Sequence, residues 1–156
     1  MIRIAIPGFR DLELEHLVLD YNGTLAADGM LLPGVGHILT SLSSDIRIHV
    51  ITADTFGLAA AQLAGLPVEL TILPAELQAE AKFDFVSQLG GDSVVAIGNG
   101  RNDRKMLKAA AIGIVLIQKE GSSTETLASA DVVSFNILEA LDLFRNPKRL
   151  IATLRS

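Results

Sequence analysis

Leu17-Val-Leu-Asp20-Tyr-Asn-Gly-Thr24 is the stretch that decides the fold, because an apolar run ends there at a carboxylate followed by a glycine-containing turn. A short apolar run bounded by turn residues is typical of a buried strand. Two more Val- and Ile-rich runs, residues 49–52 and 94–98, also end in polar clusters. Ligands bind outside the carboxyl ends of the strands in open parallel sheets. If the three strands are neighbours, one edge of the sheet carries Asp20, Thr52, Asn99 and Asp103.

Short apolar segments alternate with segments of helical periodicity along the whole chain, which is the pattern of βαβ units. The expected strands are residues 2–6, 12–20, 46–52, 68–73, 93–97, 112–117 and 131–134. The first two are joined by a Pro7-Gly8 turn and are expected to form an opening hairpin. The expected helices are residues 34–43, 56–64, 75–89, 102–111, 122–129 and 137–144. Right-handed crossovers between parallel strands then predict an α/β fold, with a mainly parallel sheet and helices on both faces.

Composition narrows the class of protein. The 156 residues carry a net charge of −5, which argues against a general nucleic-acid binder. The chain has no cysteine, which excludes disulfides, thiolate zinc sites and cysteine nucleophiles. The apolar start of the chain is too short for a signal peptide, and no apolar run approaches the roughly 18 residues that span a bilayer. We therefore expect one cytoplasmic domain over residues 1–156, with neither nucleic acid nor membrane as a partner.

Each polar element also has a purely structural explanation. Asn22-Gly23 is the commonest dipeptide of two-residue hairpin turns, and Thr52 is a β-branched strand residue. Lys82 has acidic neighbours at helical spacing, which is typical of a solvated helix face. The order of these elements, and their position at strand ends, favours a shared functional site instead.

In that order, the segments resemble the motifs of the haloacid dehalogenase (HAD) superfamily. The four motifs correspond to Asp20-Tyr-Asn-Gly-Thr24, Thr52, Lys82 and Gly98-Asn-Gly-Arg-Asn-Asp103. Residues 52–65, 102–113 and 128–133 further resemble the phosphorylation domain of P-type ATPases. The resemblance implies a three-layer, Rossmann-like HAD fold. About thirty residues separate Asp20 from Thr52, and a similar number separate Thr52 from Lys82. Only a small flap hairpin at residues 25–32 is therefore expected, and no cap domain.

The resemblance implies a role for each motif residue. Asp20 is implied as the nucleophile that becomes an aspartyl phosphate, with Thr52 and Lys82 stabilising the transferred group. The implied phosphate-binding residues are Gly23, Thr24, Thr52, Ala53 and Lys82. The implied cofactor is Mg²⁺, and the residues implied to hold it are Asp20, Asn22 through its backbone carbonyl, Asn99 and Asp103.

Two residues depart from the family pattern. Asn22 stands where HAD phosphatases have the aspartate that protonates the leaving group and activates water. General acid–base catalysis contributes about 10²–10⁴-fold, so hydrolysis is expected to be slow. Asn99 stands where the family has a metal-binding aspartate, so metal affinity is expected to fall.

Two functions stay open at this point. One is a slow Mg²⁺-dependent phosphatase or phosphotransferase; the other is a catalytically degenerate HAD domain that binds phosphate or a partner without turnover. A response-regulator receiver is disfavoured by the length of the chain and by the position of Asp20 near its start. An open, capless site suits a bulky phosphorylated substrate or a neighbouring subunit, so a homo-oligomer (a dimer or a tetramer) is a further hypothesis.

Overall fold

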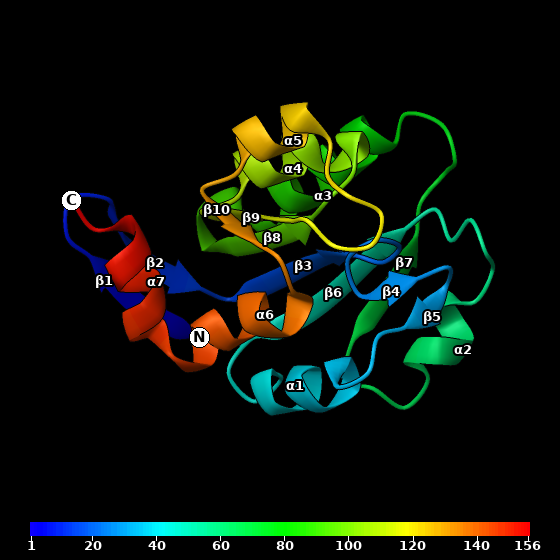
Figure 1. Ribbon diagram of the computed structural model, residues 1–156, viewed down its shortest axis with the longest axis horizontal. Helices are drawn as coiled ribbons and strands as arrows, with labels where there is room; N and C mark the ends of the chain where they lie inside the picture. Colours follow the sequence, from blue (N-terminus) through cyan, green and yellow to red (C-terminus); the bar gives the residue numbers. More distant parts are fainter.

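The computed structural model describes all 156 residues and has a parallel sheet of six strands at its centre (Figure 1). The strand order is β10-β9-β8-β3-β6-β7, and every neighbouring pair is parallel. These strands are β3 (His16–Asp20), β6 (Arg47–Thr52), β7 (Glu69–Ile72), β8 (Val94–Gly98), β9 (Ile112–Leu116) and β10 (Val132–Ser134). The predicted α/β class is therefore confirmed.

Helices cover both faces of this sheet. They are α1 (Val35–Leu42), α2 (Ala59–Leu63), α3 (Gln78–Leu89), α4 (Arg104–Ala109), α5 (Thr124–Ser129), α6 (Ile137–Arg145) and α7 (Pro147–Leu154). Two short 3₁₀ helices, η1 (Gly91–Ser93) and η2 (Arg101–Asp103), flank β8. In Figure 1, α3, α4 and α5 lie on one side of the sheet, while α1 and α6 lie on the other.

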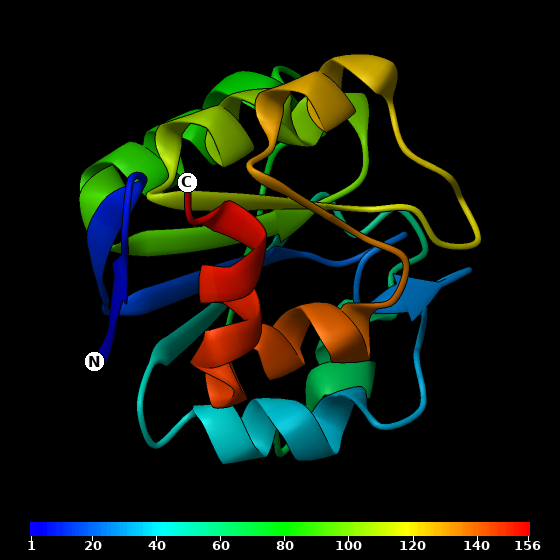
Figure 2. The ribbon, with the colours of Figure 1, turned by 60° about the vertical axis from the view of Figure 1, so that its left-hand side comes forward.

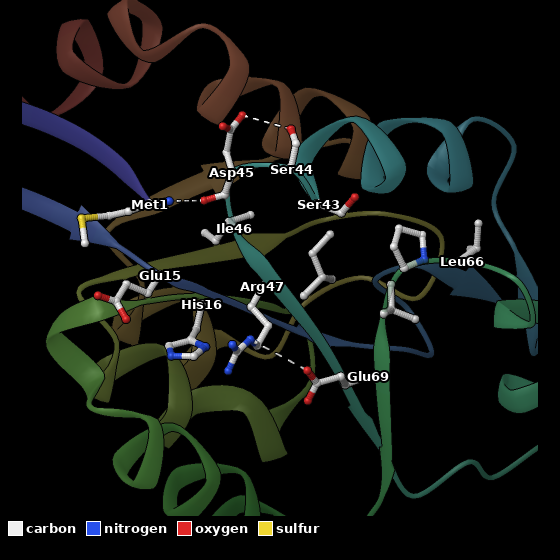
Figure 3. A pocket seen from close by; sticks show the side chains of 13 residues that line it. Met1, Glu15, His16, Ser43, Ser44, Asp45, Ile46, Arg47, Leu66 and Glu69 are labelled. Carbon is white, nitrogen blue, oxygen red and sulfur yellow. Dashed lines mark hydrogen bonds and ion pairs between the residues drawn. The ribbon is translucent and has the colours of Figure 1, made fainter.

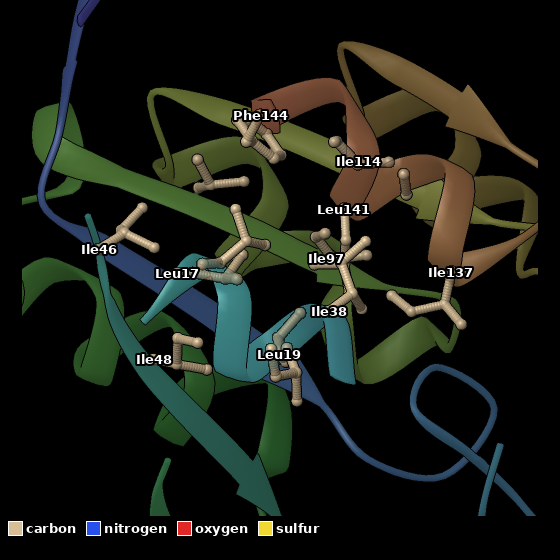
Figure 4. Packing of buried hydrophobic residues seen from close by; sticks show 14 of the residues in the cluster. Leu17, Leu19, Ile38, Ile46, Ile48, Ile97, Ile114, Ile137, Leu141 and Phe144 are labelled. Atoms are coloured by element: carbon tan, nitrogen blue, oxygen red, sulfur yellow. The ribbon is translucent and has the colours of Figure 1, made fainter. Parts of the chain in front are cut away.

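The sequence of β3 explains this layering, because successive side chains of a strand point to opposite faces. Val18 packs with Val86 and Met106 in the cluster beneath α3 and α4. Leu17 and Leu19 instead join the larger cluster on the α1 and α6 face (Figure 4). A strand that is apolar on both faces is the signature of a covered parallel sheet. The three-layer arrangement is thus confirmed.

The chain reverses direction across the sheet at β3. From β3 it crosses to β6 on one side, and later returns to β8 on the other side. Such a switch point opens a crevice at the carboxyl ends of the strands. Asp20, Thr52 and Gly98 are the last residues of these three neighbouring strands, so the first, second and fourth motifs meet at this crevice.

The expected opening hairpin is confirmed, but the expected single strand over residues 12–20 is wrong. The chain forms two strands there: β2 (Arg10–Leu14) pairs antiparallel with β1 (Ile2–Ile6), and β3 belongs to the main sheet. The buried residues reveal the break, because Leu12 and Leu14 alternate in one phase while Leu17 and Leu19 alternate in the other. A continuous strand cannot keep both sets buried on one face, so the chain changes sheet at Glu15.

Helix α7 has no counterpart among the expected elements. It begins at Pro147, which suits the first turn of a helix, and buries Leu150. It packs against β1, so the last helix covers the first hairpin (Figure 2). The largest late starts are those of α2, which begins at Ala59, and α3, which begins at Gln78 after Leu77 adopts a left-handed φ of 53°.

The segment between β3 and α1 contains only the small flap that was expected. Strands β4 (Ala26–Ala27) and β5 (Met30–Leu31) form an antiparallel hairpin around Asp28 and Gly29. The buried Tyr21 hydroxyl donates to the carbonyl of Gly29 at 2.8 Å and holds the flap against the sheet. No cap domain is inserted. None of the helices is both long enough and apolar enough to cross a membrane.

Candidate active site

Asp20 and Lys82 form a buried ion pair at the carboxyl end of the central strand. Lys82 projects from α3, is 1% exposed, and places its Nζ 2.7 Å from Asp20 Oδ1. The same Nζ lies 2.7 Å from Asp103 Oδ1. The interpretation of Lys82 as part of a solvated helix face is therefore wrong, because one buried ammonium group serves two buried carboxylates.

This centre carries one negative charge more than Lys82 neutralises. Burial raises the pKa of Asp20 to about 6, and the nearby charge of Asp103 adds to the effect although Lys82 opposes it. Burial would lower the pKa of Lys82, but Asp103 and Asp20 outweigh it and hold that pKa above its ordinary value. Lys82 thus stays charged, and the uncompensated negative charge is expressed as the raised pKa of Asp20.

Asp103 anchors Lys82 and the fourth-motif loop. Its Oδ2 accepts hydrogen bonds from the backbone N–H groups of Asn99 and Gly100, both at 2.9 Å. Its side chain is fully buried. This approach requires glycine at position 98, where a Cβ atom would stand 2.5 Å from Asp103 Oδ2. Both carboxylate oxygens of Asp103 are therefore engaged within the protein.

The other oxygen of Asp20 faces a second group of oxygen atoms. The hydroxyl of Thr24 lies 3.3 Å from Asp20 Oδ2 and 3.5 Å from Asn99 Oδ1. Asn99 Nδ2 donates to the carbonyl of Gly121 at 3.1 Å, which turns its Oδ1 toward Thr24. One hydroxyl proton thus faces two acceptors. Lys82 lies on one side of Asp20, and an oxygen-rich side lies opposite.

Thr52 has its oxygen occupied and its proton available. Thr52 Oγ1 accepts a hydrogen bond from the backbone N–H of Asp54 at 2.9 Å. Asp54 Oδ1 in turn accepts from the N–H groups of Leu58 and Ala59, both at 3.1 Å, at the start of α2. Asp54 therefore holds the second-motif loop on α2, and the Thr52 hydroxyl can donate toward the crevice.

A cavity of about 190 Å³ opens between these strand ends. Its lining residues are Asp20, Asn22, Thr52, Ala53, Thr55, Gln78, Asn99, Gly100, Asn102 and Glu120. Five of the residues expected in the site thus line it, while Lys82 and Asp103 lie behind Asp20. Gly23 and Thr24 form the adjoining turn, where their N–H groups donate to the carbonyls of Ala26 and Tyr21.

Five lining residues were not among the expected site residues: Gly100 and Asn102, which lie within the fourth motif, and Thr55, Gln78 and Glu120. Asn102 Nδ2 donates to Gln78 Oε1 at 2.7 Å, which links the start of α3 to the fourth motif. Glu120 lies in the loop after β9, near Gly23. A Cβ atom on Gly23 would stand 2.1 Å from Glu120 Oε2 and 2.5 Å from Asn99 Nδ2. The only signal in the sequence is a polar residue before Gly121, just after an apolar run.

The oxygen-rich side of Asp20 fits a hard cation, although three carboxylate or imidazole groups do not meet anywhere in the structure. Asp20 Oδ2 and Asn99 Oδ1 both lie within reach of Thr24. Asn22 Oδ1, in the same cavity, is buried and has no hydrogen-bond partner. Mg²⁺ prefers carboxylate, amide and carbonyl oxygens. The donor set is thus suitable, with amides where carboxylates are more usual.

The largest cavity lies at the opposite, amino end of the strands (Figure 3). It measures about 690 Å³, and His16, Arg47 and Glu69 are among its lining residues. His16 Nδ1 lies 3.1 Å from His49 Nε2, and burial lowers the pKa of both histidines. His16 and Asp20 are the two ends of β3. Size alone therefore points to the wrong end of the sheet, away from Asp20 and Lys82.

No protein-family model matches the chain. Over 62 residues it is 48% identical to an uncharacterised protein of Methanocaldococcus jannaschii, covering 40% of this chain and 67% of that protein. Over 104 residues it is 30% identical to a probable cadmium/zinc-transporting ATPase of Arabidopsis thaliana, covering 65% and 12%. Over 71 residues it is 39% identical to a phosphoserine phosphatase of Idiomarina loihiensis, covering 42% and 31%. The chain thus spans less than a third of the two relatives with a named activity.

Solved structures share the fold over nearly the whole chain. A 3-deoxy-D-manno-octulosonate 8-phosphate phosphatase of Moraxella catarrhalis, in complex with magnesium, phosphate and KDO, has a TM-score of 0.71 at 20% identity, covering 92% of this chain and 94% of that one. The cobalt-bound form of the Haemophilus influenzae phosphatase has a TM-score of 0.70 at 16% identity, with the same coverage. Three observations indicate the same relationship: the sheet order, the motifs at the strand ends, and the similarity to a P-type ATPase and to phosphatases. The chain therefore has the capless fold of HAD-superfamily phosphatases, and parts of its sequence are similar to a P-type ATPase and to a phosphoserine phosphatase.

Proposed function

We propose that the protein is a Mg²⁺-dependent phosphatase or phosphotransferase that works through an aspartyl phosphate on Asp20. The observation that carries this proposal is the polarity around Asp20. Its Oδ1 is bound by the buried Lys82, while its Oδ2 faces an oxygen-rich cavity suited to a cation. A carboxylate meets a phosphate dianion only if positive charge offsets their repulsion.

Each residue of the site has a part in this reaction. Asp20 attacks phosphorus, the bond from phosphorus to the leaving oxygen breaks, and the aspartyl phosphate forms. Thr52 donates its free hydroxyl proton to a phosphoryl oxygen, beside Ala53 in the cavity wall. Lys82 neutralises charge that passes to the phosphoryl group. Asp20, Asn99 and the carbonyl of Asn22 would hold Mg²⁺, which supplies Lewis-acid charge stabilisation.

Asp103 has a different part from the one its motif implies. Its oxygens already accept from Lys82, Asn99 and Gly100. We therefore assign Asp103 to positioning Lys82 and the fourth-motif loop, with no direct metal bond. Gly23 and Thr24 shape the turn, since their N–H groups donate within it and leave none for phosphate.

The step that frees Asp20 is expected to be slow. Asn22 lines the cavity where the leaving group departs and water attacks, and an amide cannot exchange a proton at neutral pH. The degenerate, binding-only alternative is disfavoured by the buried cluster of Lys82, Asp20 and Asp103. Such clusters often cost stability relative to apolar side chains, so a domain without chemistry gains nothing from this one.

The test is hydrolysis of p-nitrophenyl phosphate with and without Mg²⁺, beside the Asp20→Asn variant. Turnover that needs Mg²⁺ and is lost in the variant supports the proposal. Equal turnover of both proteins refutes it. Acid trapping of a phosphoenzyme then distinguishes an aspartyl phosphate from direct attack by water on the substrate.

Other parts of the hypothesis rest on the sequence alone. We propose that residues 1–156 act as one catalytic domain on a phosphorylated substrate in the cytoplasm, with neither nucleic acid nor membrane as a partner. The open cavity suits a bulky substrate or a neighbouring subunit, so a homo-oligomer remains a prediction. Light scattering at micromolar concentration tests it.

A further inference from the structure

The carboxylate of Glu120 has no hydrogen-bond or ion-pair partner in the structure, yet it lies at the cavity of the active site. Its Oε2 stands 2.1 Å from the point that a Cβ atom on Gly23 would occupy, and Asn99 Oδ1 stands 2.7 Å from that same point. Glu120 and Asn99 also line one cavity with Asp20. Glu120 therefore faces the oxygen-rich side of Asp20, away from Lys82.

Hydrogen bonds hold the loop that carries Glu120 against the turn after Asp20 and against the fourth-motif loop. Gln118 Nε2 donates to the carbonyls of Gly23 and Thr24, at 3.1 and 3.0 Å. On the other side of Glu120, Asn99 Nδ2 donates to the carbonyl of Gly121 at 3.1 Å. Ser123 donates its N–H to the carbonyl of Asn99 at 3.0 Å. Glu120 is thus placed by residues on either side of it.

The charge balance of the site explains why a carboxylate at position 120 matters for a metal ion. Lys82 alone leaves Asp20 and Asp103 one positive charge short. Glu120 is exposed and lies at the wall of the same cavity, where it offers a divalent cation a second carboxylate beside Asp20. Asn99 contributes an oxygen but no charge, so without Glu120 a Mg²⁺ ion there would meet only one uncompensated carboxylate.

We propose that Glu120 supplies the metal-site carboxylate that the fourth motif lacks at Asn99, either as a direct ligand or through a metal-bound water. The inference rests on the proposed Mg²⁺ site and names the residue that completes it. Its geometry is independent of the motif pattern, because the loop after β9 belongs to none of the four motifs.

The experiment measures Mn²⁺ binding to the full chain by electron paramagnetic resonance, with Mg²⁺ as competitor, at pH 7.5. The variants are Glu120→Gln and its matched control Glu15→Gln, which removes the same charge from an exposed residue at the amino end of β3. Loss of a residue that ligates or orients a metal weakens binding by about 10–100-fold. We therefore expect at least about tenfold weaker binding for Glu120→Gln, and wild-type affinity for Glu15→Gln.

A second variant guards against an indirect effect. Asn99→Asp, added to Glu120→Gln, returns one carboxylate to the cavity and is expected to recover most of the lost Mn²⁺ affinity. Equal affinity of Glu120→Gln and wild type overturns the assignment of Glu120 and leaves the Mg²⁺-dependent function standing. Failure of the wild-type chain to bind Mn²⁺ or Mg²⁺ at millimolar concentration overturns both. Binding is read without turnover, so slow chemistry does not obscure the result.

Discussion

Replacing Asp20 with asparagine is expected to stabilise the metal-free protein while abolishing its activity. Asp20 is buried beside Asp103, and the two carboxylates share the single charge of Lys82. Asparagine has nearly the same shape and no charge. Asp20→Asn therefore removes the uncompensated charge and leaves Lys82 paired with Asp103.

The size of the effect follows from the pKa of Asp20, which burial and Asp103 raise from 3.8 to about 6. Each unit is worth about 1.4 kcal/mol, so ionising Asp20 in the folded state costs about 3 kcal/mol. The pKa of Asp20 is higher in the folded state than in the unfolded state. The folded protein therefore keeps its full stability below about pH 4, where Asp20 is protonated, and loses this amount as the pH rises through about 6. Asp20→Asn has no charge at this position, so it does not lose this stability at any pH.

The assay is urea denaturation in EDTA, followed by far-ultraviolet circular dichroism at pH 4 and pH 8. At pH 8 we expect Asp20→Asn to be more stable than wild type by about 1–3 kcal/mol, or to melt roughly 2–12 °C higher. At pH 4 the difference should nearly vanish. Asp84→Asn, at an exposed site, is the control and should change stability by less than about 0.5 kcal/mol.

Added Mg²⁺ should reverse the order at pH 8, because it stabilises only a protein that retains its ligand carboxylate. If Asp20→Asn is less stable than wild type at pH 8 in EDTA, Lys82 fully compensates both carboxylates. The description of an uncompensated buried charge would then be refuted.

Three further outcomes are expected. Asn22→Asp returns a proton-transfer group to the cavity and should raise Mg²⁺-dependent turnover of p-nitrophenyl phosphate, by up to about 10²–10⁴-fold; unchanged turnover would place the slow step elsewhere. Lys82→Met leaves two buried carboxylates without a cation and should destabilise the protein by about 3–5 kcal/mol at pH 8 in urea titrations; a smaller loss would mean that water reaches them. Gly23→Ala should reduce turnover, because its φ of 81° is strained for alanine and its Cβ would displace Asn99 and Glu120. The control Gly65→Ala has the same positive φ but open space around it, so it should lose stability alone.

Local patterns predicted most of the fold, because a buried parallel strand needs a run such as Leu17-Val-Leu that is apolar on both faces. The single strand over residues 12–20 was wrong because the apolar run looks continuous unless its alternation is followed across Glu15. Helix α7 was missed because it buries only Leu150 completely and so carries little apolar pattern. Its stability comes from packing against β1, a contact that no local pattern contains.

The site was predictable where chemistry coincides with a strand end, as at Asp20 and Thr52. It was not predictable where two loops meet by way of the sheet order. Glu120 reaches Gly23 because the loop after β9 lies against the turn after β3, with β8 between the two strands. Lys82 was ambiguous for a related reason, since only its burial distinguishes an active-site lysine from a surface one.

The hydrogen bonds of Gln118 make the turn after Asp20 depend on residues that are synthesised much later. Besides holding the carbonyls of Gly23 and Thr24, Gln118 accepts a hydrogen bond at its Oε1 from the N–H of Ile137 at 2.8 Å. On the ribosome the turn that follows Asp20 therefore emerges long before the side chain that fixes it. A nascent chain lacking residues 118–137 has only the hydrogen bonds within this turn and its flap to support it. The turn that follows Asp20 therefore reaches its final hydrogen-bonded form only after residue 137 has been synthesised.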